Sequence, residues 1–170
     1  MKNLFSPAVV VSIISLCSVV GLSSAQTHSD ASAARKEPVM SDANGTFDVK
    51  LTPQTSDGQD ANLGRMSIDK QFHGDLEGTS KGEMLTGMTS VKGSAGYVAM
   101  EKVTGTLQGR HGSFILQHTG TMDRGAPQLS VTVVPDSGTD ELVGLSGKLT
   151  IKIADGKHSY EFEYAIVKRD

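Results

Sequence analysis

The chain has 170 residues, of which 37% are hydrophobic, 21% charged and 5% aromatic, so it can form one domain and is too polar for several membrane spans. Its formal charge is -3, and no block of like charge occurs, which argues against nucleic acid as a partner. Its 19 glycines disfavour a helical bundle, because Gly inside a helix costs roughly 1 kcal/mol relative to Ala. The composition favours an all-β fold.

Residues 1–25 have the features of a secretory signal peptide. Lys2 precedes an apolar stretch over 4–22, and small residues follow at 23–25. Serines interrupt the apolar stretch, which disfavours a membrane anchor. Leu16 stands before Cys17, where a lipoprotein signal requires a small residue, so we expect no lipidation. We expect cleavage after Ala25 and a periplasmic or secreted protein that does not associate with the membrane once the signal is removed.

The segment over 26–42 is polar, rich in Ala and Ser, and free of aromatic residues. Such a segment cannot bury enough apolar area to order itself, so it predicts a flexible leader. The β-barrel domain is expected over 43–170. Cys17 is the only cysteine, and its removal with the signal peptide would leave neither disulfides nor thiol chemistry.

From Gly45 onward, polar and apolar residues alternate, with turn signals about every ten residues, as in β-sandwiches and barrels. The predicted strands cover 45–51, 63–73, 76–88, 96–108, 113–124, 127–135, 146–154 and 157–168. Eight antiparallel strands can close into a barrel whose interior is filled by side chains or holds one small ligand.

Two turns keep the inward residues of neighbouring strands in phase. Apolar residues occupy even positions on both sides of Gly74-Asp75, which requires an odd-length loop or a bulge there. Asp155-Gly156 is a strong signal for a two-residue turn, and it predicts that Leu149 pairs with Phe162.

The hairpin of 96–108 and 113–124 contains the strongest candidate site. Pairing Gly109 with Gly112 places Glu101 and His118 diagonally on the inward face. A buried carboxylate is costly unless it is paired. The two residues therefore form a structural pair, hold the polar end of a ligand, or act as a general base with its orienting partner.

Two further residues are candidates for ligand binding. Tyr97 faces inward and offers both an apolar ring and a hydroxyl. Lys70 is the one charge among the inward even positions of its strand. It could join Glu101 and His118, but we expect it at the barrel mouth.

Metal and cofactor sites are not expected. His73, Asp75 and Glu77 alternate like metal ligands on a strand, yet the turn required there separates them. There is no glycine-rich phosphate loop followed by a helix, and no G-x-S-x-G motif. We therefore expect neither a nucleotide cofactor nor a serine hydrolase.

Four phrases of the sequence resemble, in the same order, those of a bacterial family of domains of unknown function. They are FHGDLEGTS at 72–80, MEKVTGTLQGR at 100–110, GSFILQH at 112–118 and SGTDELVGLSG at 137–147. That family is grouped by fold with the plant allene oxide cyclase barrels. The resemblance covers 43–170 and implies an antiparallel eight-stranded, allene oxide cyclase-like barrel and a homo-oligomer, as a dimer or trimer. It implies no activity, and no working residue of the plant enzyme is carried over.

The leading hypothesis is an exported barrel that binds a small amphipathic or apolar molecule, whose polar end meets Glu101, His118 and Tyr97. One alternative is an enzyme of the isomerase or cyclase type that uses the same cavity, with Glu101 as base. Another is a structural, self-associating barrel with a filled core. A cavity larger than a few waters would favour the first two, and the sequence leaves open whether the protein is an enzyme.

Overall fold

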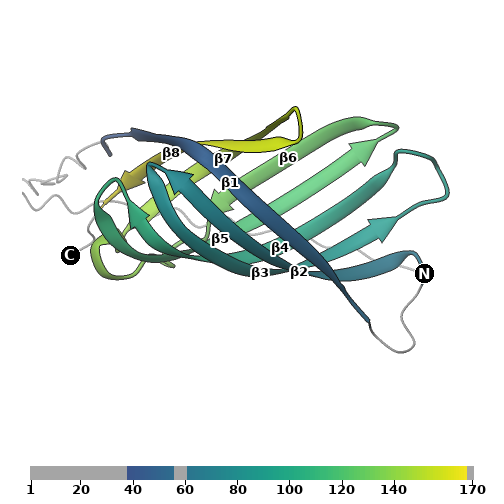
Figure 1. The fold of residues 1–170 in the computed structure, drawn as a ribbon, viewed down its shortest axis with the longest axis horizontal. Coiled ribbons are helices and arrows are strands. Elements are labelled where there is room, and N and C mark those ends of the chain that lie inside the picture. The colour runs from purple at the N-terminus through teal and green to yellow at the C-terminus, as the bar shows by residue number, and fades with distance from the viewer. Residues whose placement is uncertain (1–37, 56–60, 168–170) are drawn as a thin grey trace, which may run out of the picture. The chain divides into compact units, whose positions relative to one another are not determined.

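The computed structural model describes residues 38–55 and 61–167, and within these ranges eight strands form an antiparallel barrel (Figure 1). The predicted signal peptide, 1–25, and residues 26–37 of the predicted leader lie outside the described residues. The strands are β1 (Ser41–Gln54), β2 (Leu63–Gly74), β3 (Leu76–Met88), β4 (Ala95–Leu107), β5 (Arg110–Asp123), β6 (Ala126–Val133), β7 (Leu145–Ala154) and β8 (Lys157–Ile166).

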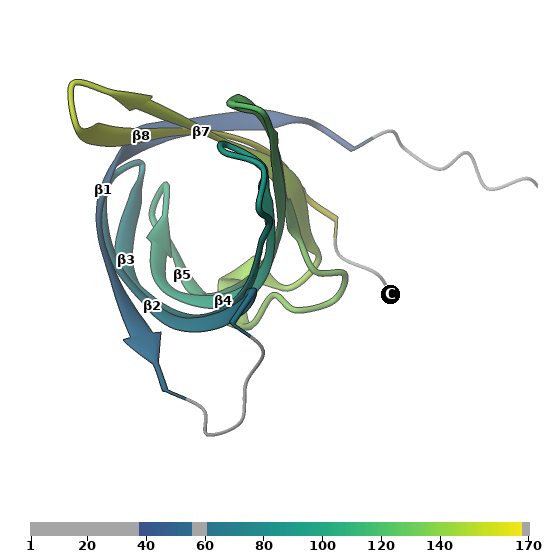
Figure 2. The same cartoon turned by 90° about the vertical axis from the view of Figure 1, so that its right-hand side faces the viewer.

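Each strand pairs with the next in sequence, and β8 pairs with β1 to close the ring seen in Figure 2. The predicted all-β fold and the eight-stranded barrel are therefore confirmed. The described part of the chain has one short 3-10 helix, η1 (Asp140–Leu142), and contains no helix of the length and apolarity needed to cross a membrane.

The first strand is longer than its side-chain pattern predicts. We expected it to begin at Gly45, but β1 begins at Ser41, and Ser41 and Asp42 pair with Tyr164 and Glu163 of β8. Backbone groups of β8 supply the pairing, and this needs no apolar side chain on the β1 side. The alternating pattern underestimates a strand wherever its end is held by a neighbour's backbone.

The turn between β2 and β3 has the predicted odd length. Phe72 pairs with Gly78, so even positions stay inward on both strands. Gly74 has a φ of 110°, and a Cβ at this position would lie 2.8 Å from the Asn44 carbonyl oxygen. Only glycine fits this turn without strain. The Asp155-Gly156 turn is also as predicted, with Leu149 opposite Phe162.

The predicted register of the β4–β5 hairpin is wrong. The turn consists of Gln108 and Gly109, so that Val103 pairs with Phe114 and not with His118. Both turn residues have positive φ, 45° and 82°, as a tight two-residue hairpin turn requires. The register is shifted by four residues, an even number, and because side chains alternate with period two, every inward residue stays inward.

Side chains fill one half of the barrel. The core at this end combines aromatic and aliphatic residues from most of the strands, and Phe114 stacks on Phe162 with ring centroids 5.8 Å apart. The loop over 134–144 closes the end: Leu142 is fully buried, and the loop runs along β5, where Thr139 donates its N–H to the Ser113 carbonyl oxygen at 2.9 Å. This half provides a rigid base for the residues nearer the open end.

The β6–β7 boundary, which we call the seam, is the least connected part of the barrel wall. Only Thr132 and Lys148 are in register across it, whereas the other pairs of neighbouring strands share seven or more register pairs. Towards the open end, residues 126–131 of β6 pair only with β5, and 149–154 of β7 pair only with β8. In Figure 2 the tip of the β7–β8 hairpin extends outward from the ring.

Candidate functional site

A cavity of about 480 Å³ occupies the half of the barrel that the core leaves unfilled. This volume is in the range of small-molecule sites, and the wall is predominantly apolar, as is usual for them. The residues that line it are Phe47, Val49, Leu51, Ile68, Lys70, Met84, Thr86, Met88, Ala95, Gly96, Tyr97, His118, Gly120, Thr121, Met122, Pro127, Gln128, Leu129, Ile151, Ile153 and His158. Three of the four predicted site residues, Lys70, Tyr97 and His118, are among them.

Glu101, the fourth predicted residue, is fully buried and joins the others into one cluster. Lys70 Nζ donates a hydrogen bond to its Oε2 at 2.7 Å, and the Ser80 hydroxyl donates one to its Oε1. His118 Nε2 lies 3.0 Å from Oε2. The imidazole N–H is poorly directed at that oxygen, so this is a close polar contact and not a well-formed hydrogen bond.

The diagonal relation of Glu101 and His118 survives the error in the register. Glu101 pairs with Leu116, and His118 pairs with Ala99, so the two side chains are diagonal neighbours on the inward face. The predicted register made them diagonal in the opposite sense. Because the true register is shifted by four residues, His118 lies two residues on the other side of the partner of Glu101, and the two side chains are again diagonal neighbours.

We expected Lys70 at the barrel mouth, but it lies inside the barrel. Its side chain is 7% exposed, and its ammonium lies 4.8 Å from the centroid of the Phe47 ring and 5.7 Å from that of Phe72. The carboxylate of Glu101 and the faces of two aromatic rings stabilise the charge at this depth. Parity indicates that a residue faces inward, but its depth along the axis depends on the stagger of the strands.

Three neighbouring side chains determine the ionisation of Glu101. Burial alone would raise the pKa of its carboxyl, but contact with His118, the charge and hydrogen bond of Lys70 and the hydrogen bond of Ser80 outweigh burial and lower the pKa from 4.5 to about 2. Glu101 is therefore a carboxylate at all physiological pH values. Both of its oxygens accept hydrogen bonds, from Lys70 of β2 and Ser80 of β3, and His118 of β5 lies in close contact.

Tyr97 is held against the opposite strand by a glycine. Gly120 is its register partner, and a Cβ on Gly120 would lie 2.2 Å from Tyr97 Cε1. The ring therefore packs closely against Gly120 and forms part of the cavity wall. Burial, followed by the charge of Glu101, raises the pKa of Tyr97, so its hydroxyl stays protonated and can donate a hydrogen bond.

Ser80 is the member of the cluster that we did not predict. It is 1% exposed and lies directly opposite Lys70 in the β2–β3 ladder. The signal was present, because Ser80 shares the even parity of the inward residues of β3. A small hydroxyl on an inward position is a weak signal unless a buried carboxylate is known to be nearby.

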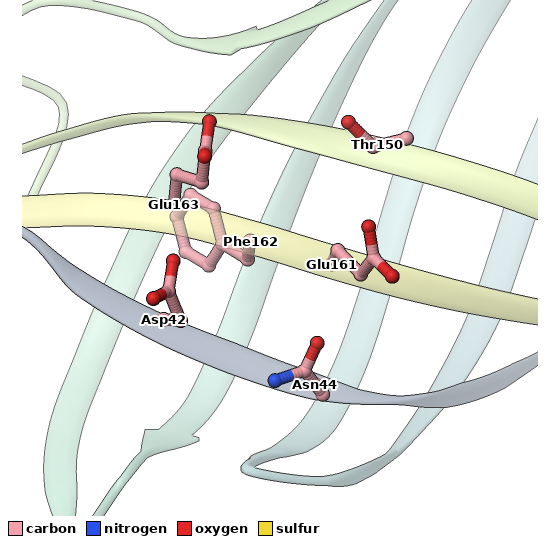
Figure 3. Close-up of a pocket in the computed structure, with 6 residues that line it drawn as sticks. All are labelled: Asp42, Asn44, Thr150, Glu161, Phe162 and Glu163. Atoms are coloured by element: carbon pink, nitrogen blue, oxygen red, sulfur yellow. The ribbon is translucent and has the colours of Figure 1, made fainter.

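A second pocket lies on the outer surface of β1, β7 and β8 (Figure 3). Its polar side chains are exposed, and three of them, Asp42, Glu161 and Glu163, are acidic. Glu161 already accepts a hydrogen bond from Lys152. The described ranges contain no group of three His, Cys, Asp or Glu side chains that could hold a metal ion. We therefore assign no site to this pocket.

Fold and cavity together define the class of this protein: a closed antiparallel eight-stranded barrel, filled at one end and hollow at the other. The model of the family "Protein of unknown function (DUF3224)" matches residues 43–164, and the chain belongs to this family. The crystal structure of a DUF3224 protein of unknown function from Shewanella oneidensis MR-1 is similar. It has a TM-score of 0.73 and 51% sequence identity over 77% of this chain and 100% of that chain. No curated protein matches.

Proposed function

We propose that this barrel binds a small, largely apolar molecule with one polar end inside its cavity. The observation that carries the proposal is the combination of an apolar wall with a small polar cluster, in which Lys70 and His118 are almost fully buried. Burying such groups is costly, and an interior used only for packing would favour apolar residues there.

Binding is better supported than catalysis by Glu101. A general base works best when its pKa lies near the operating pH, whereas the pKa of Glu101 is about 2. Both carboxylate oxygens are also occupied by protein donors. The alternative of an isomerase or cyclase with Glu101 as base therefore has less support. The alternative of a filled, purely structural core is disfavoured by the cavity of about 480 Å³.

The test uses a matched pair of tryptophan variants. Thr86 lines the cavity, and its neighbour Leu85 points outward and is 55% exposed. Wild type and Leu85→Trp should both bind the uncharged dye N-phenylnaphthylamine, which fluoresces in apolar surroundings. Thr86→Trp should weaken its binding by more than about tenfold, because the indole fills the space. Equal binding by both variants would contradict the proposal. If Thr86→Trp weakens binding as expected, native mass spectrometry of protein from its own host would identify the natural ligand.

We also propose that the protein is exported and acts in the periplasm or outside the cell. The support is the signal-like sequence of 1–25, with its basic start, apolar stretch and small residues before the cut. The intact mass of protein from the host should correspond to a chain that begins at Gln26. A mass that retains 1–25, or that includes an acyl chain on Cys17, would contradict this.

A further inference from the structure

Among the described lining residues, the side chain that carries a full charge is a hydrogen-bond donor, the ammonium of Lys70. Among the residues that the structure describes, no Asp or Glu lines the cavity, whereas Lys70 and two histidines, His118 and His158, do. The one acidic residue of the cluster, Glu101, lies outside the lining, and its two oxygens are already engaged. A ligand in the cavity therefore contacts the ammonium of Lys70 and not the Glu101 carboxylate that pairs with this ammonium.

Lys70 has donors to spare. Its ammonium has three N–H groups, and within the described part of the chain its one hydrogen-bond acceptor is Glu101 Oε2. The Tyr97 hydroxyl has no hydrogen-bond partner among these residues, and the raised pKa of Tyr97 keeps it a donor. Two donors on the wall of one cavity, one of them positively charged, are complementary to a hydrogen-bond acceptor that carries negative charge.

We infer that the polar end of the ligand is an anion, of the carboxylate or sulfonate kind, and that Lys70 is the residue that selects it. Glu101 is a positioning residue: it accepts a hydrogen bond from the ammonium of Lys70 at the cavity wall, and Ser80 and His118 contact its carboxylate. The ligand class is therefore an apolar organic anion small enough for about 480 Å³. This inference rests on the proposed binding function and adds the charge of the ligand.

The experiment compares two dyes that share one aromatic body. Anilinonaphthalene sulfonate has a sulfonate that N-phenylnaphthylamine lacks, and both fluoresce when they enter apolar surroundings. Wild type should bind the sulfonate about 10- to 100-fold more tightly, as expected for hydrogen bonds to a charged group. Lys70→Met should abolish this preference, so that the two dyes bind with similar affinity. Lys81→Met, which removes a lysine that is 82% exposed on the outer surface, should retain the preference.

The outcomes separate the inference from the proposed function. Equal affinity of wild type for the two dyes, or a preference that survives in Lys70→Met, overturns the inference while binding itself stands. If neither dye binds, or Thr86→Trp binds both as wild type does, the proposed function fails and the inference with it. Should Lys70→Met not fold because Glu101 is left unpaired, the double variant Lys70→Met/Glu101→Gln removes both charges and answers the same question.

Discussion

Replacing Glu101 by Gln measures how much the buried cluster stabilises the barrel. In the folded chain the pKa of this carboxyl is lowered from 4.5 to about 2, chiefly because contacts with His118 and Lys70 outweigh burial. The folded-state pKa lies below the unfolded one, so the ionised carboxylate stabilises the fold above about pH 4.5, and this stabilisation is lost as the pH falls towards 2. The difference corresponds to roughly 3 kcal/mol at neutral pH.

Glu101→Gln removes this contribution and leaves Lys70 buried without its anion. Removing one partner of a buried ion pair costs about 3 to 5 kcal/mol, and we expect a loss of that size at pH 7. Urea unfolding followed by circular dichroism gives the free energy of unfolding of both proteins. Glu83→Gln is the matched control, since Glu83 pairs with Arg65 on the surface and is 55% exposed, and it should cost less than about 1 kcal/mol.

The pH dependence provides the decisive comparison. The difference in unfolding free energy between wild type and Glu101→Gln should shrink as the pH falls below about 4.5, because the wild-type carboxylate is then progressively protonated in the unfolded chain. A loss below about 1 kcal/mol at pH 7 would refute the assignment of Glu101 to a buried charged cluster. So would a difference between the two proteins that stays constant across the acidic range.

Two further perturbations address the cavity wall. Gly120→Ala should displace the Tyr97 ring, since the added Cβ would lie 2.2 Å from Tyr97 Cε1. The displaced ring should change the affinity for the uncharged dye. Unchanged affinity would show that the ring does not form part of the binding surface. Residues 126–131 and 149–154 lack a ladder across the seam, whereas β4 is paired on both sides. Amide hydrogen exchange should therefore be faster in these two segments than in β4. Equal protection would contradict the weak seam.

Parity, more than register, could be predicted from this sequence. Alternation placed Glu101, His118 and Lys70 on inward positions, and all three are buried. The β4–β5 register was beyond reach, because Gln108 is an unusual residue for a positive φ. Its conformation is held by distant residues: its N–H donates to the Asp75 carbonyl oxygen at 2.7 Å, and its side-chain oxygen accepts from the Tyr164 hydroxyl at 2.7 Å.

The composition of the site was only partly predictable, for a related reason. Lys70 and Ser80 are directly opposite each other, but both are 21 or more residues from Glu101 in sequence, so only the stagger of three strands brings them together. The side chains that line the open half of the interior leave a cavity of about 480 Å³ between them. Volume of this kind is a property of the closed barrel and has no local signal in the sequence.

The seam has a consequence for the range of molecules that the barrel can accommodate. In a β-barrel in which every pair of neighbouring strands is joined by a full hydrogen-bond ladder, the number and stagger of the strands fix the diameter. Such a barrel can widen only if a ladder breaks. Here Leu129 and Ile151 stand on strands that no ladder joins beyond Thr132. Between the Thr132–Lys148 pair and the open end, the two strands can move apart without breaking a ladder, so the cavity can widen on this side while the rest of the wall keeps its diameter.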